Sequence, residues 1–439
     1  MLLWLAECCV IFVTFCCVLL FPEETLTGEG AILFMEVIQA SQMNPKFRDE
    51  IADLVKNYDF TQCLACGMCT AGCPYSDIHE NQDPRKFLRK IVLGLKEEAW
   101  NDPYIWYCTM CERCTIECPM GVNIPSIVRS MRGQMEPRGY LQTIAEEHKA
   151  SGNQMNVSQE DYEETLAWIE EELQAELDDP DYRIPLNKQG AKYFYGFNAR
   201  DIKYYPHELQ ATLKLFYAAD LDYTISTVRW DATNIALFTG KTDDFLAISM
   251  PLWEEVVRLG CEELIVTECG HAFRSMRWGY RTYWKGKEFK IRHILQLLND
   301  LVKEGRLKLD PNAITEVVTY HDPCNTARKE GVWEEPRELI RSFIKNFVDM
   351  NPNGKMNYCC GAGGGGMAMP EYNEYRKAKG KRKVDQVVAT GAEIVIVPCH
   401  NCIDQFNDLN KWYPEKAKSK NVHMCSLMER ALILDKKNK

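Results

Sequence analysis

The chain has no surplus of basic residues. Its 439 residues include 52 lysines and arginines against 63 aspartates and glutamates, a formal net charge of −11. Because phosphate backbones are bound by basic surfaces, this balance argues against nucleic acid as a partner. No lysine or arginine precedes Lys46, so the basic start of a signal peptide is missing. No motif of a serine hydrolase or another nucleophile–histidine enzyme is present.

The chain opens with an apolar run from Leu2 to Phe21. Its length is close to the ~20 residues that cross a bilayer as a helix. It also contains Glu7 and has no flanking basic residues that would orient a membrane span. Two interpretations stay open for residues 1–34: they form a membrane anchor, or translation starts later, at Met35 or Met43.

Cysteine is abundant, with 20 residues in the chain. Such a count in a small secreted protein would indicate a disulfide framework, but this chain is long enough for two or three domains. Thirteen of the cysteines stand at spacings that are typical of metal clusters. A reducing compartment and inserted metal therefore explain the cysteines better than disulfides do.

The first half of the chain contains two cysteine runs of identical spacing: Cys63-x-x-Cys66-x-x-Cys69-x-x-x-Cys73-Pro74 and Cys108-x-x-Cys111-x-x-Cys114-x-x-x-Cys118-Pro119. The pattern is typical of ferredoxins with two [4Fe-4S] cubane clusters, in which the cysteine before proline crosses to the other cluster. We therefore expect two ligand sets: Cys63, Cys66, Cys69 and Cys118, and Cys108, Cys111, Cys114 and Cys73. Structural zinc sites do not repeat this pattern.

Helices are expected around and after these runs. Asp83 and Pro84 predict a helix start, which is followed by apolar residues at helical spacing, and we assign residues 35–140 to a helical ferredoxin domain. Residues 160–177 are predicted to form an acidic amphipathic helix that ends at Asp178-Asp179-Pro180. Residues 141–185 are expected to form an acidic helical linker.

The second half of the chain contains five further cysteines: Cys324, the adjacent pair Cys359 and Cys360, and Cys399 and Cys402. Four thiolates complete an ordinary cubane, so a fifth indicates a spectator or an unusual iron–sulfur centre. Glycines follow the pair, and we expect Gly361, Gly363 and Gly364 to bring backbone N–H groups close to the cluster. The alternatives are a four-ligand zinc site and a dinucleotide-binding glycine loop, which no apolar strand precedes.

The second half also contains one α/β pattern used twice. The segment from Gly391 to Cys402 and the segment from Gly260 to His271 both show a buried-strand pattern that runs into a polar turn. We expect a first repeat over 186–310 and an intact repeat over 311–439. In the first repeat only Cys269, with His271 nearby, remains as a possible ligand, and the alternative is a buried thiol with a satisfied histidine.

The five-cysteine pattern resembles the CCG cysteine-rich domain of the heterodisulfide reductase family. The resemblance implies a mixed α/β fold, with a helical two-cluster ferredoxin domain before a duplicated CCG domain. It implies a noncubane [4Fe-4S] cluster that acts on disulfides, bound by Cys324, Cys359, Cys360, Cys399 and Cys402. These cysteines are the expected catalytic residues, and Cys269 or His271 would complete the site.

One intact CCG motif behind a ferredoxin domain is similar to the CCG-domain iron–sulfur proteins of the heterodisulfide reductase, DsrK, Tmc and Hmc type. This resemblance implies an oxidoreductase in a membrane complex on the cytoplasmic face of the cell membrane, associated with sulfate respiration in anaerobes. The implied partners are a membrane cytochrome b subunit, the menaquinone pool, and a small thiol protein such as DsrC. Electrons would pass through the two cubanes to the third cluster.

Two other functions stay open at this point. The chain could be an electron-transfer subunit without substrate chemistry, or the iron–sulfur subunit of a flavin-dependent glycolate or glycerol-3-phosphate dehydrogenase. A basic run follows the glycines, and we interpret it as a landing site for an acidic partner: Arg376, Lys377, Lys379, Lys381, Arg382 and Lys383.

Overall fold

A computed structural model describes residues 40–56, 60–79 and 82–434 of the chain. The apolar run at residues 2–21 therefore lies outside the described residues. In the part of the chain that is described, no helix is long and apolar enough to cross a membrane. Two compact units are distinguished, and the first contributes only the short 3-10 turn η1 (Ala40–Gln42) to the description. The following paragraphs concern the unit from Asn44 onward.

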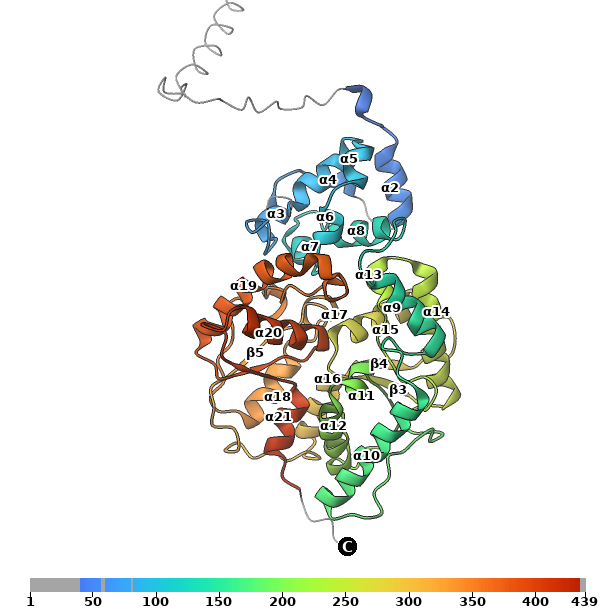
Figure 1. Cartoon of the computed structure of the whole chain (residues 1–439), viewed down its shortest axis with the longest axis vertical. Coiled ribbons are helices and arrows are strands. Elements are labelled where there is room, and N and C mark those ends of the chain that lie inside the picture. The colour runs from blue at the N-terminus through green and yellow to red at the C-terminus, as the bar shows by residue number, and fades with distance from the viewer. Residues whose placement is uncertain (1–39, 57–59, 80–81, 435–439) are drawn as a thin grey trace, which may run out of the picture. The chain divides into compact units, whose positions relative to one another are not determined.

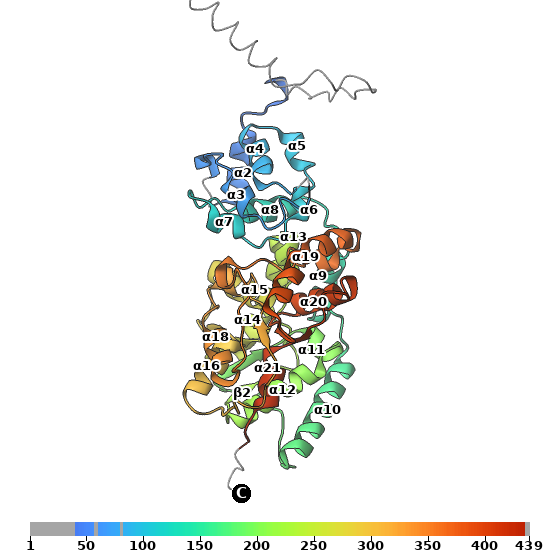
Figure 2. The ribbon, with the colours of Figure 1, turned by 90° about the vertical axis from the view of Figure 1, so that its left-hand side faces the viewer.

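Short helices form the part of this unit that carries the two cysteine runs (Figures 1 and 2). The helix α4 begins as the sequence predicts, because the Asp83 carboxylate accepts a 3.0 Å hydrogen bond from the backbone N–H of Lys86 and Pro84 occupies the first turn. The helices are α2 (Phe47–Val55), α3 (Met68–Gly72), α4 (Pro84–Val92), α5 (Lys96–Trp100), α6 (Tyr104–Tyr107), α7 (Arg113–Glu117) and α8 (Ile124–Arg132).

Two longer helices, α9 (Leu141–Ser151) and α10 (Gln159–Leu177), lead from this part to the sheets. The acidic helix predicted at 160–177 is confirmed as α10. Ser158 caps its start, and it buries one apolar stripe: Tyr162, Leu166, Ile169 and Leu173. It ends at Asp178, whose φ of 51° leaves the helical region.

A four-stranded parallel sheet follows, in the order β2-β1-β3-β4. Its strands are β1 (Tyr193–Gly196), β2 (Tyr223–Thr224), β3 (Glu263–Val266) and β4 (Lys290–His293). Strand β3 is buried along its whole length, as expected of a strand covered on both faces. Its connecting and covering helices are α11 (Ala199–Lys203), α12 (Pro206–Ala218), α13 (Ala236–Thr239), α14 (Thr242–Arg258), α15 (Gly270–Tyr283) and α16 (Ile294–Lys303).

A second parallel sheet has three strands in the order β5-β6-β7. Its strands are β5 (Val318–Tyr320), β6 (Ile394–Ile396) and β7 (Lys420–Val422). Its helices are α17 (Ala327–Glu330), α18 (Glu335–Phe343), α19 (Asn373–Thr390), α20 (His400–Trp412) and α21 (Met424–Ala431). The mixed helix-and-sheet fold expected from the sequence is therefore confirmed.

In each sheet, one buried strand leads into a cysteine at the start of a helix. Strand β3 leads into Cys269, whose side chain caps helix α15, and strand β6 leads into Cys399, which occupies the N-cap position of helix α20. Ligand sites of parallel sheets lie beyond the carboxyl ends of the strands. Both cysteines therefore stand where such a fold places chemistry.

Candidate functional site

The two cysteine runs fold into loops that share a left-handed residue at the same position. Ala65 (φ 51°) and Met110 (φ 52°) each occupy the left-handed region between the first two cysteines of their run. Their N–H groups each donate a 3.4 Å hydrogen bond to a sulfur, to Cys63 Sγ in one loop and to Cys108 Sγ in the other. A loop that turns in this way can wrap several thiols around one centre, and N–H···S bonds stabilise thiolates there.

The loops bring the first eight cysteines together in the two predicted sets. Four of them line one cavity: Cys63, Cys66, Cys69 and Cys118. The Cys73 thiol lies beside those of Cys108 and Cys111, and the Cys114 thiol faces the same three cysteines. The cysteine before proline thus crosses to the other loop in both directions. The first set reaches the surface, because Cys66 is exposed, whereas Cys108, Cys111 and Cys114 of the second set are buried.

The five cysteines of the second half form a continuous line of thiols. The side chain of Cys359 contacts those of Cys324 and Cys360, and Cys402 contacts Cys360 and Cys399. The Cys360 and Cys402 sulfurs are 3.3 Å apart. Each of the five is at most 6 % exposed. All sixteen cysteines of the described residues are free thiols, so this line is available for metal.

Cys269 adds a sixth thiol to the end of this line. Its thiol hydrogen-bonds Cys399, which holds the pKa of Cys399 well below its usual range, while the same contact raises the pKa of Cys269. The amide of Asn198 also approaches the Cys269 sulfur at 3.7 Å. The segment between β3 and α15 therefore contributes one thiol to the end of the five-cysteine line.

His271 is held by the backbone. Its Nε2–H donates a 2.6 Å hydrogen bond to the carbonyl of Asn234, and the centroid of its ring lies 4.7 Å from that of Phe238. Burial lowers the pKa of His271 to about 4, so the ring is neutral at physiological pH. These contacts agree with the satisfied-histidine alternative.

His321, which the sequence did not indicate as a ligand, lies close to the thiols of Cys360 and Cys402. The ring of His321 is fully buried, and one of its nitrogens lies within 4.8 Å of the Cys360 and Cys402 sulfurs. Burial and the nearby Lys383 lower the pKa of His321 well below its usual range. The available signal was its place, directly after a buried strand and three residues before Cys324.

The glycines after the cysteine pair have two different roles. The N–H of Gly361, at φ 106°, donates a hydrogen bond to the sulfur of Cys359. A Cβ on Gly364 would instead lie 2.4 Å from the carbonyl oxygen of Cys108. Arg132 stabilises this contact by binding both segments. Its Nη1 donates a 2.6 Å hydrogen bond to the Gly364 carbonyl, and its Nη2 donates a 3.0 Å hydrogen bond to the Cys108 carbonyl.

The interpretation of the basic run as a docking surface is wrong for three of its six residues. Arg376, Lys379 and Lys383 are buried on one face of α19, and Lys381 is the exposed member. Burial lowers the pKa of Lys379 and of Lys383 to about 8 each, against the opposing effect of nearby thiolates. The thiolates explain the burial, because a buried cation needs a counter-charge.

The second cysteine set adjoins the five-thiol line. Cys111 packs in the same buried cluster as the five thiols. Arg328 Nη1 donates a 2.8 Å hydrogen bond to the carbonyl of Cys111, and the Tyr75 hydroxyl donates a 2.9 Å hydrogen bond to the carbonyl of Cys359. These contacts fix the ferredoxin loops against the last sheet.

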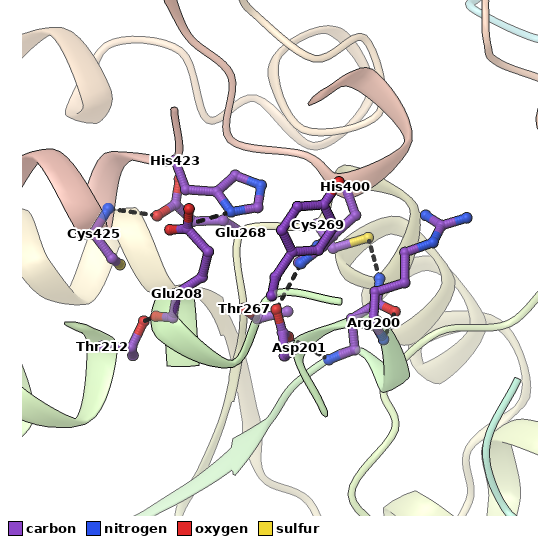
Figure 3. A network of polar contacts seen from close by, with 12 residues as sticks. Arg200, Asp201, Glu208, Thr212, Thr267, Glu268, Cys269, His400, His423 and Cys425 are labelled. Atoms are coloured by element: carbon purple, nitrogen blue, oxygen red, sulfur yellow. Dashed lines mark hydrogen bonds and ion pairs between the residues drawn. The ribbon is translucent and has the colours of Figure 1, made fainter. Parts of the chain in front are cut away.

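A buried polar network supports the other side of the line (Figure 3). The Nε2–H of His400, which follows Cys399, donates a 2.6 Å hydrogen bond to Asp201 on α11. Glu268, which precedes Cys269, accepts 2.7 Å hydrogen bonds from two backbone N–H groups at the start of α21. Although burial opposes the charged ring of His423, Glu208 raises its pKa to about 9. The network ties both helix starts that carry thiols to α11, α12 and α21.

These donor sets fit iron–sulfur clusters. Each of the first two sets offers four thiols around one point, and the third offers five to six thiols with buried cations beside them. Thiolate-only sets with N–H···S bonds are the usual environment of such clusters. The zinc alternative does not account for the number of converging thiols, since zinc closes with four ligands.

Two family matches cover the cysteine-bearing segments. Residues 62–123 match the family described as a 4Fe-4S dicluster domain, and residues 318–407 match the family described as a cysteine-rich domain, CCG. The curated relatives extend the similarity to most of the chain. The chain is 25 % identical over 420 residues to a probable membrane-anchored ferredoxin of Chromohalobacter salexigens. This alignment covers 85 % of this chain and 61 % of that protein.

Two further relatives have more specific names. The chain is 26 % identical over 352 residues to an Hdr-like menaquinol oxidoreductase iron-sulfur subunit of Archaeoglobus profundus, covering 67 % of this chain and 61 % of that protein. It is 26 % identical over 391 residues to a dihydromethanophenazine:CoB–CoM heterodisulfide reductase subunit of Methanosarcina barkeri, covering 81 % of this chain and 90 % of that protein. It spans about three fifths of the length of the ferredoxin and menaquinol oxidoreductase relatives. One segment of the chain thus matches a dicluster ferredoxin domain and another matches a CCG domain, and most of the chain is similar to heterodisulfide reductase-like iron–sulfur proteins.

Proposed function

We propose that the chain is an iron–sulfur subunit of an oxidoreductase complex that reduces or forms a sulfur–sulfur bond at its five-cysteine site. The proposed cofactors are two [4Fe-4S] cubanes and one noncubane [4Fe-4S] cluster, which when bound supply one-electron transfer and an iron site for a substrate sulfur. The observation that carries the proposal is the spatial order of the three thiol sets. They lead from the exposed Cys66, through Cys111, to the buried Cys360.

The chain's own residues support this function by excluding water and balancing charge. Lys383 and Lys379 are fully buried beside the thiolates of the second and third sets. Arg328 and Arg132 bind backbone carbonyls of the Cys108–Cys111 loop, and so hold it at a fixed distance from the last sheet. Fixed geometry and a low-polarity surrounding both favour electron transfer between neighbouring sites, because little has to reorganise.

The partners and the location that the sequence resemblance implies are part of this proposal. Two relatives are named as membrane-anchored or as a menaquinol oxidoreductase subunit, which supports a place in a membrane complex, and we propose its cytoplasmic face. A cytochrome b subunit, the menaquinone pool and a DsrC-like thiol protein would serve as partners there. We also propose the domain boundaries given by the sequence, with repeats over 186–310 and 311–439.

Iron content and one substitution test the proposal. Anaerobically prepared protein should contain about twelve irons. Replacing Cys360 with Ala should leave the cubane signals and abolish turnover of a disulfide-bearing substrate protein, whereas Cys261→Ala, at another buried free thiol, should leave both unchanged. About eight irons together with bound zinc, or parent turnover in the Cys360 variant, would overturn it.

A second candidate function has one observation in its favour. All five thiols of the third set are buried, so a protein substrate reaches them only after a local opening of the chain. An electron-transfer subunit without substrate chemistry needs no such opening. Under this alternative, the Cys360→Ala variant would lose electron transfer to a partner subunit, and no thiol protein would be consumed by the parent protein.

A further inference from the structure

We infer that His321 is a nitrogen ligand of the iron–sulfur centre that the five cysteines bind, so that this centre has a mixed thiolate and imidazole ligand set. The inference rests on the proposed function, because it presupposes a cluster at Cys360 and Cys402. It adds a ligand that the cysteine pattern does not contain.

Distances support a shared metal. The ligand atoms of His321, Cys360 and Cys402 all lie within 4.8 Å of one another, and the two sulfurs are 3.3 Å apart. Thiolate and imidazole ligands of one tetrahedral metal ion stand about 3.5 to 3.8 Å apart, given metal–ligand bonds of about 2.0 to 2.3 Å. Small side-chain rotations therefore suffice to bring the three groups onto one iron.

The hydrogen bonding of His321 leaves both ring nitrogens for this role. Among the histidines in the described part of the chain, it is the one whose two ring nitrogens are both buried without a hydrogen-bond partner, and its exposed fraction is 0 %. Buried polar groups in proteins are nearly always partnered, because an unpaired one loses its hydration without compensation. A bond to a metal is a partner that such a ring can have.

The position of the ring is fixed by its neighbours. The backbone N–H of His321 donates a 2.9 Å hydrogen bond to the carbonyl of Ile396 on β6. The next residue, Asp322, forms an ion pair with Arg337 at 2.7 Å. The ring centroid of Phe406 lies 5.1 Å from that of the imidazole. The loop between β5 and Cys324 is therefore held on both sides of His321, with the imidazole at the thiols.

Imidazole is a chemically suitable ligand for iron in this position. Iron–sulfur clusters accept histidine in place of cysteine at individual irons, and the exchange of an anionic thiolate for a neutral ring raises the reduction potential. A ligand set with five thiolates carries a large negative charge in a buried site. A neutral sixth ligand adds coordination without adding to that charge.

Isotope labelling gives a direct test on the intact holoprotein. The chain is prepared anaerobically with ¹⁵N-labelled histidine, and pulsed electron paramagnetic resonance is recorded on the paramagnetic state of the five-thiolate centre. We expect a nitrogen hyperfine coupling that changes with the label and that disappears in a His321→Leu variant with its cubane signals intact. A matched His148→Leu variant, which removes another buried histidine on α9, should keep the coupling.

The outcomes separate this inference from the proposed function. A chain with about twelve irons and no histidine coupling overturns the His321 ligand and leaves the proposed function standing. A coupling that survives in His321→Leu also overturns it. If that variant does not fold, the labelled parent protein still decides between coupling and no coupling. A parent protein with about eight irons and no third centre overturns both proposals.

Discussion

A Cβ atom on Gly363 would lie 2.5 Å from the carbonyl oxygen of Thr109. The glycine loop after Cys359 and Cys360 is therefore in backbone contact with the loop that carries Cys108 and Cys111. This contact joins the ferredoxin helices to the CCG part of the chain at the point where their thiol sets meet. A side chain at Gly363 would separate the two sets.

Substituting Gly363 with Ala should thus weaken this junction. The clash with a backbone carbonyl has to be relieved by a shift of one loop, at a cost of about 1 to 3 kcal/mol. We expect a lower melting temperature and slower electron transfer between the cubanes and the third centre, measured by rapid-mixing spectroscopy.

Gly366→Ala is the matched control in the same loop, because its nearest contact, Arg376 Cδ at 3.5 Å, is an ordinary van der Waals distance. Equal effects of the two substitutions would show that the contact with Thr109 has no special role.

The buried Lys383 is predicted to affect the reduction potential of the third centre, which an exposed lysine would not do. The Lys383→Met substitution removes a buried positive charge beside Cys360. Because a nearby cation favours the more negative, reduced state, the potential of the third centre should fall by an amount on the order of tens of millivolts. Lys381→Met, at the exposed position on the same helix, should leave it unchanged. A redox titration with both variants measures the difference, and equal potentials would contradict the assigned role.

The ion pair between His423 and Glu208 predicts a pH dependence of stability. The Nδ1 atom of His423 and the Oε2 atom of Glu208 are 3.6 Å apart, and the pKa of His423 is raised from 6.5 to about 9 although burial opposes the charge. A raised histidine pKa stabilises the fold fully below pH 6.5, and this contribution is lost as pH rises through about 9. Thermal unfolding from about pH 6 to about pH 10 should show this loss in the parent protein.

In the His423→Gln variant, the melting temperature should be lower at the acidic end of this range and should change less over the same range. Parent and variant curves that run parallel would mean that His423 is not charged in the folded protein.

The exposed cysteine set should lose its iron before the others. Cys66 is exposed and lines a surface cavity together with Cys63, Cys69 and Cys118, whereas the thiols of the third set are buried. Limited treatment with a chelator under mild oxidation should therefore release about four irons in a first phase. Iron analysis and the loss of one cubane signal measure this phase. Release of iron from all three centres in a single phase would contradict it.

The sequence predicts those features that depend on local spacing. The cysteine loops, the capped start of α4 at Asp83 and the stripe of α10 all have short-range patterns, and each is found in the structure. The burial of Lys379 and Lys383 could not be predicted in this way. Lysines at helical spacing normally face water, and only the thiolates of two distant segments make their burial favourable.

The roles of His321 and of the glycines also depend on tertiary contacts, so local spacing does not predict them. The sequence places His321 near Cys324, but Cys360 and Cys402 reach it only through the order of strands β5 and β6. Likewise, nothing local distinguishes Gly361, which bonds a thiolate, from Gly363, which contacts Thr109.

Cys269 offers a test of whether the four-stranded sheet supplies a ligand or a hydrogen bond to the five-cysteine site. Its thiol donates to Cys399 and holds the pKa of that cysteine low, which is the behaviour of a donor to a metal-bound thiolate. Removing such a donor leaves a more electron-rich thiolate and lowers the potential of the cluster. We therefore expect Cys269→Ala to retain about twelve irons and to titrate at a lower potential than the parent protein. Cys261→Ala, another buried thiol, serves as the control for the lost volume. Loss of iron from the third centre in Cys269→Ala alone would instead make Cys269 a ligand, since a hydrogen-bond donor can be removed without releasing the metal.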